Sequence, residues 1–326
     1  MPNPIRHFEP GQVWFSTSNV LNREFLFAPQ LNLKRHERRA LIRSGRIPEA
    51  SVEIRAIIGA CLVRALAHWP IPIYALVVMA THLHVEHGGD STNISQFFSE
   101  FLHLVATEVN RHLGRKGPVF ERRFSASACL DAEAIIAKFA YTHANPCNAN
   151  LVDHAVDYPG LSTARAVTTG AVMKFAWVDR TAYQAARHRD EQVTLADFRC
   201  ERELVPAPLP CWAHLPVEEQ RRLAAEAIRT AEEAARAKRV AEGKTVMTLD
   251  ELFSVKTSDR PSKPRANSPR PLCHASDRLT YLAYREEYRE FCYAFHAASF
   301  ELRSGNRRAL FPSHSCPPSL LYLVTG

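Results

Sequence analysis

Two segments separated by two residues stand out in the N-terminal half: the apolar IPIYALVVM at residues 71–79 and the histidine-containing HLHVEH at residues 82–87. The first is rich in β-branched and aromatic residues and is bounded by prolines, so it is predicted to be a strand. The second continues extended after the short break. Residues i and i+2 of an extended chain share a face, so the imidazoles of His82 and His84 are expected to point together while Leu83 points the other way.

Helical and extended patterns alternate on both sides of these segments. The predicted elements are a strand at 12–17, a helix at 51–68, a helix capped by residues 91–93 and closed by Gly114, a strand at 119–130, and a helix that Asp131 caps and that ends before Pro146. No glycine-rich βαβ turn is present in this order. The pattern therefore predicts an α+β domain in which one antiparallel sheet carries helices on one or both faces.

The sequence changes character after about residue 170. Four prolines lie within 206–216, and a helix rich in Ala, Glu and Arg then runs to Gly243. Residues 255–271 hold five basic residues, one acid and four prolines, which is typical either of a solvated linker or of a tether that contacts phosphates. The predicted division is an α+β domain at 1–165, a helical extension at 166–254, a basic Pro-rich linker at 255–275, and an amphipathic helix with a tail at 276–326.

Composition limits the classes of function. The chain has 326 residues, a formal net charge of +7 and a pI near 9.1, which suggests an anionic partner. No run of 18 apolar residues is present, and the N-terminus lacks the apolar core of a signal peptide. The eight cysteines never form a C-x-x-C pair, which argues against a zinc ribbon and a disulfide framework. We expect a cytoplasmic protein with no membrane partner.

Two features that carry chemistry each have an ordinary alternative. His82 and His84 have the spacing with which a strand presents two nitrogen ligands to one divalent metal, or they are two ordinary histidines. In the helix that follows residue 131, Lys138, Tyr141 and Asn145 fall on the side away from the apolar stripe. Tyr141 is therefore either an exposed tyrosine or a side chain that faces a site.

A third feature is the segment VFERRF at 119–124, where aromatic side chains bracket two arginines. A strand of this composition can bind phosphates through Arg122 and Arg123 and stack bases on aromatic faces such as Phe120. The alternative is an edge strand with its arginines directed outward and its phenylalanines directed inward.

In their order along the chain, these motifs resemble those of the single-tyrosine HUH transposases, most closely the REP-associated tyrosine transposases. The matching segments are HLH at 82–84 after an apolar strand, FERRF at 120–124, YTHANP at 141–146 and DYPGLS at 157–162. The resemblance covers roughly residues 11–165. It implies a ferredoxin-like α+β domain and a bacterial, chromosome-associated enzyme that nicks and rejoins single-stranded or hairpin DNA.

The resemblance also implies roles for individual residues. It implies a divalent metal, Mg²⁺ or Mn²⁺, and a covalent 5′-phosphotyrosine intermediate. Lys138, on the same helix face as the tyrosine, is expected to neutralise the developing charge. The matched positions are His82, His84 and Asn145 as metal ligands, Tyr141 as nucleophile, and Phe120, Arg122 and Arg123 as DNA contacts.

Five positions depart from the pattern of that family, and two of them are Ala80, where the family has a proline, and Phe120, at the usual tryptophan of the W-x-x-R motif. Thr81 stands where the family has Asn before the first histidine, Asn148 stands in place of an arginine expected near DNA, and Asn150 stands in place of a glycine. Asparagine tolerates a left-handed backbone, so the turn at Asn150 is expected to survive. These departures bear on DNA affinity and sequence preference more than on the catalytic core.

The leading hypothesis is a metal-dependent transposase that nicks hairpin-forming DNA and joins strands. A second hypothesis, which the change at Asn148 favours, is a hairpin-binding regulator whose catalysis has decayed. A third is an unrelated metallohydrolase that uses the pair His82 and His84 and forms no covalent adduct. The chain is expected to act as a monomer or a homodimer.

Overall fold

A computed structural model of the chain describes residues 5–31, 33, 35–44, 52–189, 192–262 and 271–317. Its centre is a five-stranded sheet in the order β2-β3-β1-β4-β7. Neighbouring strands pair antiparallel except β4 and β7, which are parallel. The strands are β1 (Val13–Asn19), β2 (Ile73–Met79), β3 (His82–His87), β4 (Ser125–Cys129) and β7 (Cys273–His274).

The first four strands and their helices confirm the ferredoxin-like prediction. The chain runs from β1 through α1 (Arg35–Ser44) and α2 (Glu53–His68) to β2, turns directly into β3, and passes through α3 (Ser91–His112) to β4. The two edge strands of this unit, β2 and β4, flank the central pair β3 and β1. This order makes every contact among the four strands antiparallel, as expected for an α+β sheet.

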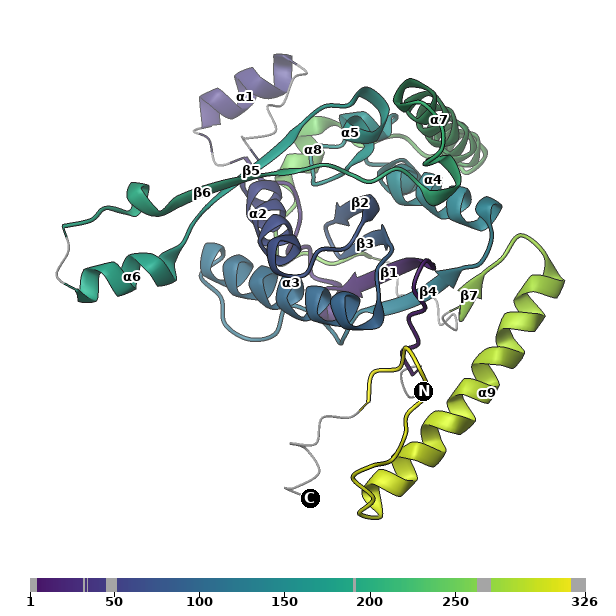
Figure 1. The fold of residues 1–326 in the computed structure, drawn as a ribbon. Helices are drawn as coiled ribbons and strands as arrows, with labels where there is room; N and C mark the ends of the chain where they lie inside the picture. The colour runs from purple at the N-terminus through teal and green to yellow at the C-terminus, as the bar shows by residue number, and fades with distance from the viewer. Residues whose placement is uncertain are drawn as a thin grey trace.

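The sheet separates two apolar cores. Helices α2 and α3 cover one face, where Leu83 and Val85 of β3 are buried, and α4 (Ala132–Asn148) covers the opposite face (Figure 1). Alternation along β3 sends His84 and Glu86 to the α4 face. His87 is out of phase with His84 and is fully buried on the other face. The α4 face therefore receives His84 and Glu86, and the opposite face receives His87.

Helix α4 begins as predicted but ends later. The Asp131 side chain accepts a hydrogen bond from the Ala134 N–H at 2.8 Å, which confirms the N-cap. The prediction that the helix ends before Pro146 is wrong, because Pro146 lies within it. Proline removes only one N–H, and α4 as a whole packs against β2 and α7. Asn150 follows with a φ of 58°, which confirms the left-handed turn.

Two other boundaries differ from the predictions. Asp90, rather than residues 91–93, caps α3, since its carboxylate accepts the Asn93 N–H at 2.9 Å. Residues 119–124 do not form a continuous strand with β4, which begins at Ser125. Phe120 makes only an isolated bridge to Val20. The paired arginines therefore lie in an exposed bend directly before β4.

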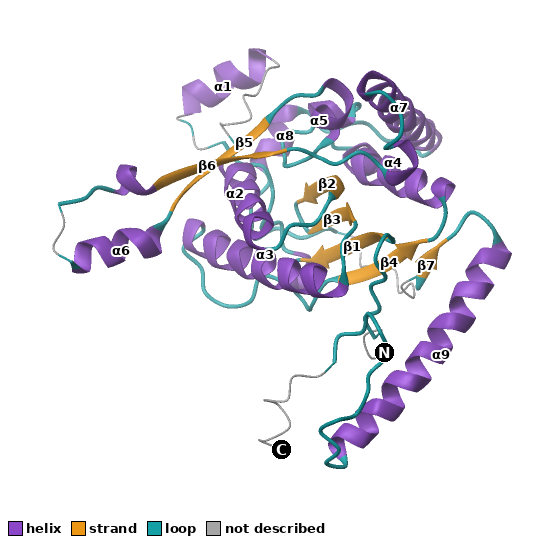
Figure 2. Cartoon of the chain, in the orientation of Figure 1, coloured by secondary structure: helices purple, strands orange, loops and turns teal. Residues whose placement is uncertain are grey.

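The C-terminal half contributes to the same body. Helix α7 packs along α4, and β7 extends the main sheet beside β4 (Figure 2). The β5–β6 ribbon projects from the body with α6, and α9 lies along the opposite side. The elements are α5 (Ala164–Thr169), β5 (Met173–Val178), α6 (Arg180–His188), β6 (Arg199–Leu204), α7 (Val217–Ala241), α8 (Leu249–Ser254) and α9 (Arg278–Arg303).

Polar contacts fix α7 against the segment that follows α4. Glu232 is buried and accepts hydrogen bonds from the Ala155 N–H at 2.6 Å and from His154 Nδ1 at 3.1 Å. Arg239, also buried, pairs with Asp153. The buried face of α7 therefore combines charged residues with the apolar residues Ala224, Ile228 and Ala235.

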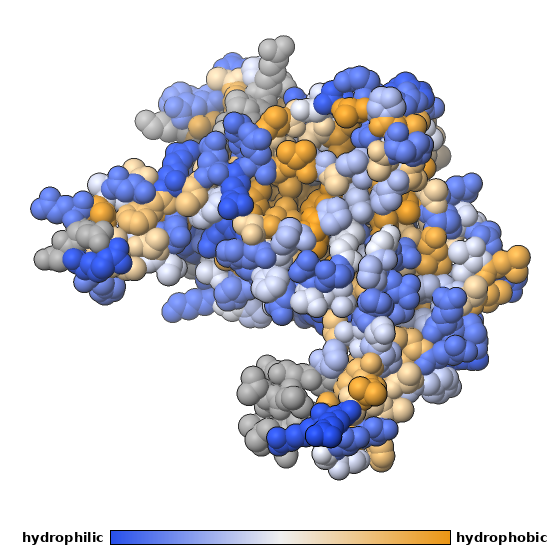
Figure 3. All heavy atoms as spheres, in the orientation of Figure 1, coloured by the Kyte–Doolittle hydropathy of each residue, from blue (hydrophilic) through white to orange (hydrophobic). Residues whose placement is uncertain are grey.

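The predicted linker at 255–275 lies partly outside the described residues, which omit 263–270, and so does the end of the predicted tail, 318–326. The predicted division into domains stays a prediction. All eight cysteines lie in the described part of the chain and are free thiols. Within that part, no helix is both long and apolar enough to cross a membrane. Figure 3 shows that hydrophilic side chains surround a central apolar area on the face that it displays.

Candidate functional site

A pocket on the α4 face of the sheet brings the two predicted histidines and the predicted tyrosine together. His82 and His84 come from β3, whereas Lys138 and Tyr141 come from α4. Other parts of its wall come from β1, β4 and the segment around β7. The pocket therefore forms where α4 crosses the central strands.

Strand register explains why these side chains converge. Thr17 of β1 lies opposite His84, and Asn19 lies opposite His82. On its other side, Thr17 lies opposite Ser125 of β4. Directly opposed residues of antiparallel strands share a face, so a polar strip runs across the sheet beneath α4.

Threonine hydroxyls contact both histidines. The imidazole centroids lie 4.7 Å apart. Thr17 Oγ1 lies 2.8 Å from His84 Nδ1, and Thr81 Oγ1 lies 2.9 Å from His82 Nδ1. Each of these contacts fixes the orientation of its ring, as partners of metal-binding histidines commonly do. Thr81, one of the departures from the family pattern, thus orients a site residue.

Burial keeps His84 neutral. Loss of hydration, with smaller effects from His82 and Lys138, holds the pKa of His84 well below its ordinary value. A neutral imidazole presents a lone pair to a metal ion. Because Thr17 engages Nδ1, the nitrogen of His84 that would bind a metal is Nε2.

Tyr141 reaches solvent while its ring lies against the site. Its side chain is 40% exposed, and its ring centroid is 5.7 Å from that of His84 and 6.0 Å from that of Phe15. The Lys138 ammonium lies 5.1 Å from the Tyr141 ring centroid and 5.3 Å from the Phe15 ring centroid. Phe15 thus forms an apolar floor between the histidine, the tyrosine and the lysine.

Lys138 is the cation at the centre of this arrangement. Burial lowers its pKa. Glu86 lies two residues beyond His84 on the same strand face and is fully buried. Burial raises the pKa of Glu86 well above its ordinary range, and neither carboxyl oxygen has a hydrogen-bond partner in the described part of the protein. Glu86 is therefore a protonated, neutral side chain next to His84 on the same face of β3.

The remaining predicted residues lie elsewhere. Asn145 is buried and is not part of the described pocket wall, although it follows Tyr141 by one helical turn.

Arg122 is exposed and pairs with Glu121 at 3.8 Å, and Arg123 is exposed at the edge of a neighbouring cavity. Phe120 packs against Phe27 with ring centroids 5.8 Å apart.

The pocket also contains residues that sequence reasoning missed. Arg23 lines it and has a φ of 56°, a left-handed conformation that is costly for a residue with a side chain. Asn19 and His274 also line it. The positive charge of Arg23 was a weak sequence signal for a place in the pocket. His274 gave no such signal, because it lies almost 200 residues from His82 and no local pattern connects the two.

The side chains of the pocket supply part of the ligand set that a divalent metal needs. The side chains of His82 and His84 share one pocket, and His84 is neutral. No group of three or more His, Cys, Asp or Glu residues is arranged to hold a metal in the described ranges. The remaining ligands of an ion bound there would therefore be amide, phosphate or water oxygens, which Mg²⁺ and Mn²⁺ accept.

The sequence matches no protein-family model and no curated protein. Among solved structures, the chain is similar to a REP-associated tyrosine transposase bound to a REP hairpin. The two share 22% sequence identity, and the match covers 52% of this chain and 87% of the other, with a TM-score of 0.35. A likeness at this level establishes neither family nor function, so the residues of the pocket must carry the functional argument.

Proposed function

We propose that this protein nicks single-stranded or hairpin DNA and transfers the cut strand through a covalent 5′-phosphotyrosine on Tyr141. One observation carries the proposal: an exposed tyrosine, a pair of histidines and a lysine share one pocket. A net charge of +7 is compatible with a polyanionic substrate. The order of motifs around His82, His84 and Tyr141 supports DNA as that substrate.

The chemistry assigned to Tyr141 is a displacement at phosphorus. Its phenol oxygen forms a bond to phosphorus while the bond between phosphorus and the 3′ oxygen breaks. The phenol loses its proton and the departing 3′ oxygen gains one. The ammonium of Lys138, close to the same ring, stabilises negative charge on the phenol oxygen and on the phosphate.

Strand joining is the reverse of this step. The 3′-hydroxyl of a second strand attacks the phosphotyrosine, forms a new phosphodiester and releases the phenol. One ester bond replaces another, so the reaction needs no nucleotide hydrolysis. The half-exposed position of Tyr141 leaves room for either strand to approach.

His82 and His84 are the proposed holders of a divalent ion, Mg²⁺ or Mn²⁺. When bound, such an ion withdraws charge from the non-bridging oxygens of the phosphate and orients it. Asn145 is proposed as a third ligand because it follows Tyr141 by one turn of α4. If so, Asn145→Ala raises the Mn²⁺ concentration needed for adduct formation, and binding of Mn²⁺ itself, followed by calorimetry, weakens in parallel.

DNA contacts are proposed for the arginines around the pocket. Arg122 and Arg123 lie in the exposed turn before β4, and Arg23 lies in the pocket wall. Guanidinium groups at such positions bind phosphates and fix the register of the strand. Phe120 is the aromatic residue proposed to contact a base.

Covalent trapping tests the proposed function. End-labelled hairpin oligonucleotides with single-stranded flanks are incubated with the protein and Mn²⁺ or Mg²⁺, and adducts that survive SDS are separated on a gel. We expect an adduct that requires metal, Tyr141 and His82. Tyr141→Phe and His82→Ala abolish it, and Tyr293→Phe, on the exposed surface of α9, leaves it unchanged.

The second candidate is a regulator that binds hairpins without cutting them. Asn148, in place of an expected arginine, and the buried position of Asn145 favour this candidate. It predicts tight binding to hairpin DNA and no adduct with any oligonucleotide or metal. An adduct that persists in Tyr141→Phe would contradict both candidates as stated.

A further inference from the structure

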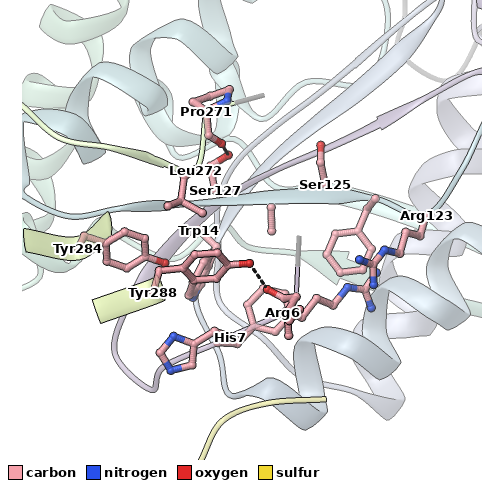
Figure 4. A pocket seen from close by; sticks show the side chains of 14 residues that line it. Arg6, His7, Trp14, Arg123, Ser125, Ser127, Pro271, Leu272, Tyr284 and Tyr288 are labelled. Carbon is pink, nitrogen blue, oxygen red and sulfur yellow. Dashed lines mark hydrogen bonds between the residues drawn. The ribbon is translucent and has the colours of Figure 1, made fainter. Parts of the chain in front are cut away.

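A second cavity adjoins the Tyr141 pocket. The two share Ser125 and Ser127 of β4 and Pro271, so they lie on either side of one common wall. The second cavity is built from the N-terminal segment, the turn before β4 and α9 (Figure 4). It therefore depends on residues from both ends of the chain.

Positive charge is concentrated in this cavity. The Arg6 guanidinium carbon lies 4.0 Å from the centroid of the Phe124 ring, and Arg123 lines the same cavity. Burial and the nearby charge of Arg123 lower the pKa of Arg6 to about 10, which leaves it a cation at neutral pH. No acidic side chain lies within ion-pair distance of Arg6 among the described residues. Two neighbouring guanidinium groups favour an anionic ligand between them.

A buried donor lines the same cavity. Trp14 is 4% exposed, and its indole N–H has no hydrogen-bond partner in the described part of the chain. An unsatisfied buried donor is costly, and an acceptor oxygen supplied by a ligand would satisfy it. The arginines and the indole are all donors, which is the chemistry that recognises a phosphate.

Helix α9 contributes aromatic rings and holds the N-terminal segment. The rings of Tyr284 and Tyr288 are nearly parallel, with centroids 6.4 Å apart and an interplanar angle of 14°. The Tyr288 hydroxyl donates a hydrogen bond to the Ile5 carbonyl at 2.8 Å, drawn as a dashed line in Figure 4. His7 stacks on Phe291 of the same helix with centroids 4.2 Å apart. These contacts fix Arg6 in the cavity.

We propose that this second cavity binds a phosphodiester of the DNA strand whose cleaved phosphate occupies the Tyr141 pocket, with an adjacent base against Tyr284 or Tyr288. The inference rests on the proposed function for the identity of the strand. Ser125 and Ser127 line both cavities, so the two sites are neighbours on opposite faces of β4. Phosphate contacts and base stacking together are how proteins hold single strands without reading sequence.

Salt-dependent binding tests the inference. Fluorescence anisotropy measures the affinity of a labelled hairpin with single-stranded flanks over a series of KCl concentrations. Arg6→Gln is expected to weaken binding about tenfold and to reduce the slope of log K against log salt by about 0.7, the value for one phosphate contact on a single strand. Arg123→Gln changes both quantities in the same direction and, being exposed, reports on binding without disturbing the core.

Two further variants sharpen the test. Arg285→Gln removes the same charge from the exposed side of α9 and is expected to match the wild type. Trp14→Phe removes a neutral donor, so it weakens binding while the salt slope stays unchanged. Wild-type affinity and slope in both Arg6→Gln and Arg123→Gln would overturn the inference. The inference would also be overturned if Arg6→Gln abolished the binding of inorganic phosphate but left the affinity for the oligonucleotide unchanged. The cavity would then hold a free anion and not a phosphate of the DNA strand.

The adduct assay separates this inference from the proposed function. Arg6-dependent DNA binding without any adduct would refute nicking and leave the second cavity as a strand-binding site. An adduct with Arg6-independent binding would refute the second cavity alone. A wild-type protein that binds no DNA would refute both.

Discussion

Replacing His87 by Gln tests how burial of β3 shapes the response of the protein to acid. His87 is fully buried on the α2–α3 face. Its Nδ1–H donates to the Gly88 carbonyl at 3.1 Å, and its Nε2 therefore accepts from the Ser16 hydroxyl at 2.8 Å. Burial lowers its pKa from 6.5 to about 4, against the effect of the bond to Gly88. The ring is neutral in the folded protein at neutral pH.

Proton linkage gives the sign and size of the change in unfolding free energy with pH. Below pH 6.5 the unfolded chain binds a proton at His87 and the folded chain does not. The contribution of His87 to the free energy of unfolding is therefore fully present above pH 6.5 and is lost as the pH falls toward 4. The loss approaches about 3 kcal/mol over the whole window and is about 2 kcal/mol between pH 7.5 and pH 5.0. His87→Gln keeps hydrogen-bonding groups and removes the titration.

Urea unfolding followed by circular dichroism at pH 7.5, 6.5, 5.5 and 5.0 measures the difference. We expect His87→Gln to be less stable than wild type at pH 7.5 and to lose about 2 kcal/mol less between pH 7.5 and pH 5.0. His188→Gln, at an exposed position on α6, serves as the control and should follow the wild-type curve. Parallel curves for wild type and His87→Gln would refute the reasoning.

Three other substitutions test packing and backbone conformation, each by the change in unfolding free energy. Phe98→Ala removes a fully buried ring that stacks 4.0 Å from Phe124, and is expected to cost about 3–5 kcal/mol; a cost below about 1 kcal/mol would mean that α3 does not pack as described. Asn150→Ala, at a φ of 58°, is expected to cost about 1 kcal/mol, whereas Asn150→Gly should be neutral or stabilising. Gly59→Ala places a Cβ 2.1 Å from the Phe175 ring and should cost about 1–3 kcal/mol by forcing α2 away from β5; unchanged stability would show that the ring moves freely.

Local patterns predicted most strands and helices between residues 12 and 148, but they missed α1 and began the strand before α4 too early. Alternation at His82 and His84 predicted their shared face, because side chains of a strand alternate with a period of two. The 3.6-residue period of α4 separated Tyr141 from the apolar stripe, and its side chain is exposed as that separation requires. Where local rules failed, as at Pro146, packing by neighbouring elements outweighed a local preference.

The amino-acid sequence by itself determined where most strands and helices around the site lie and which candidate catalytic side chains share a face, since these depend on neighbours a few positions away. Only the tertiary structure decided that Thr17 supports His84, that His274 joins their pocket, and that Tyr288 donates a hydrogen bond to Ile5 at the other end of the chain. These contacts depend on strand register and on the docking of β7 and α9. No local periodicity encodes them, because they arise when the free energy of the whole packed chain is minimised.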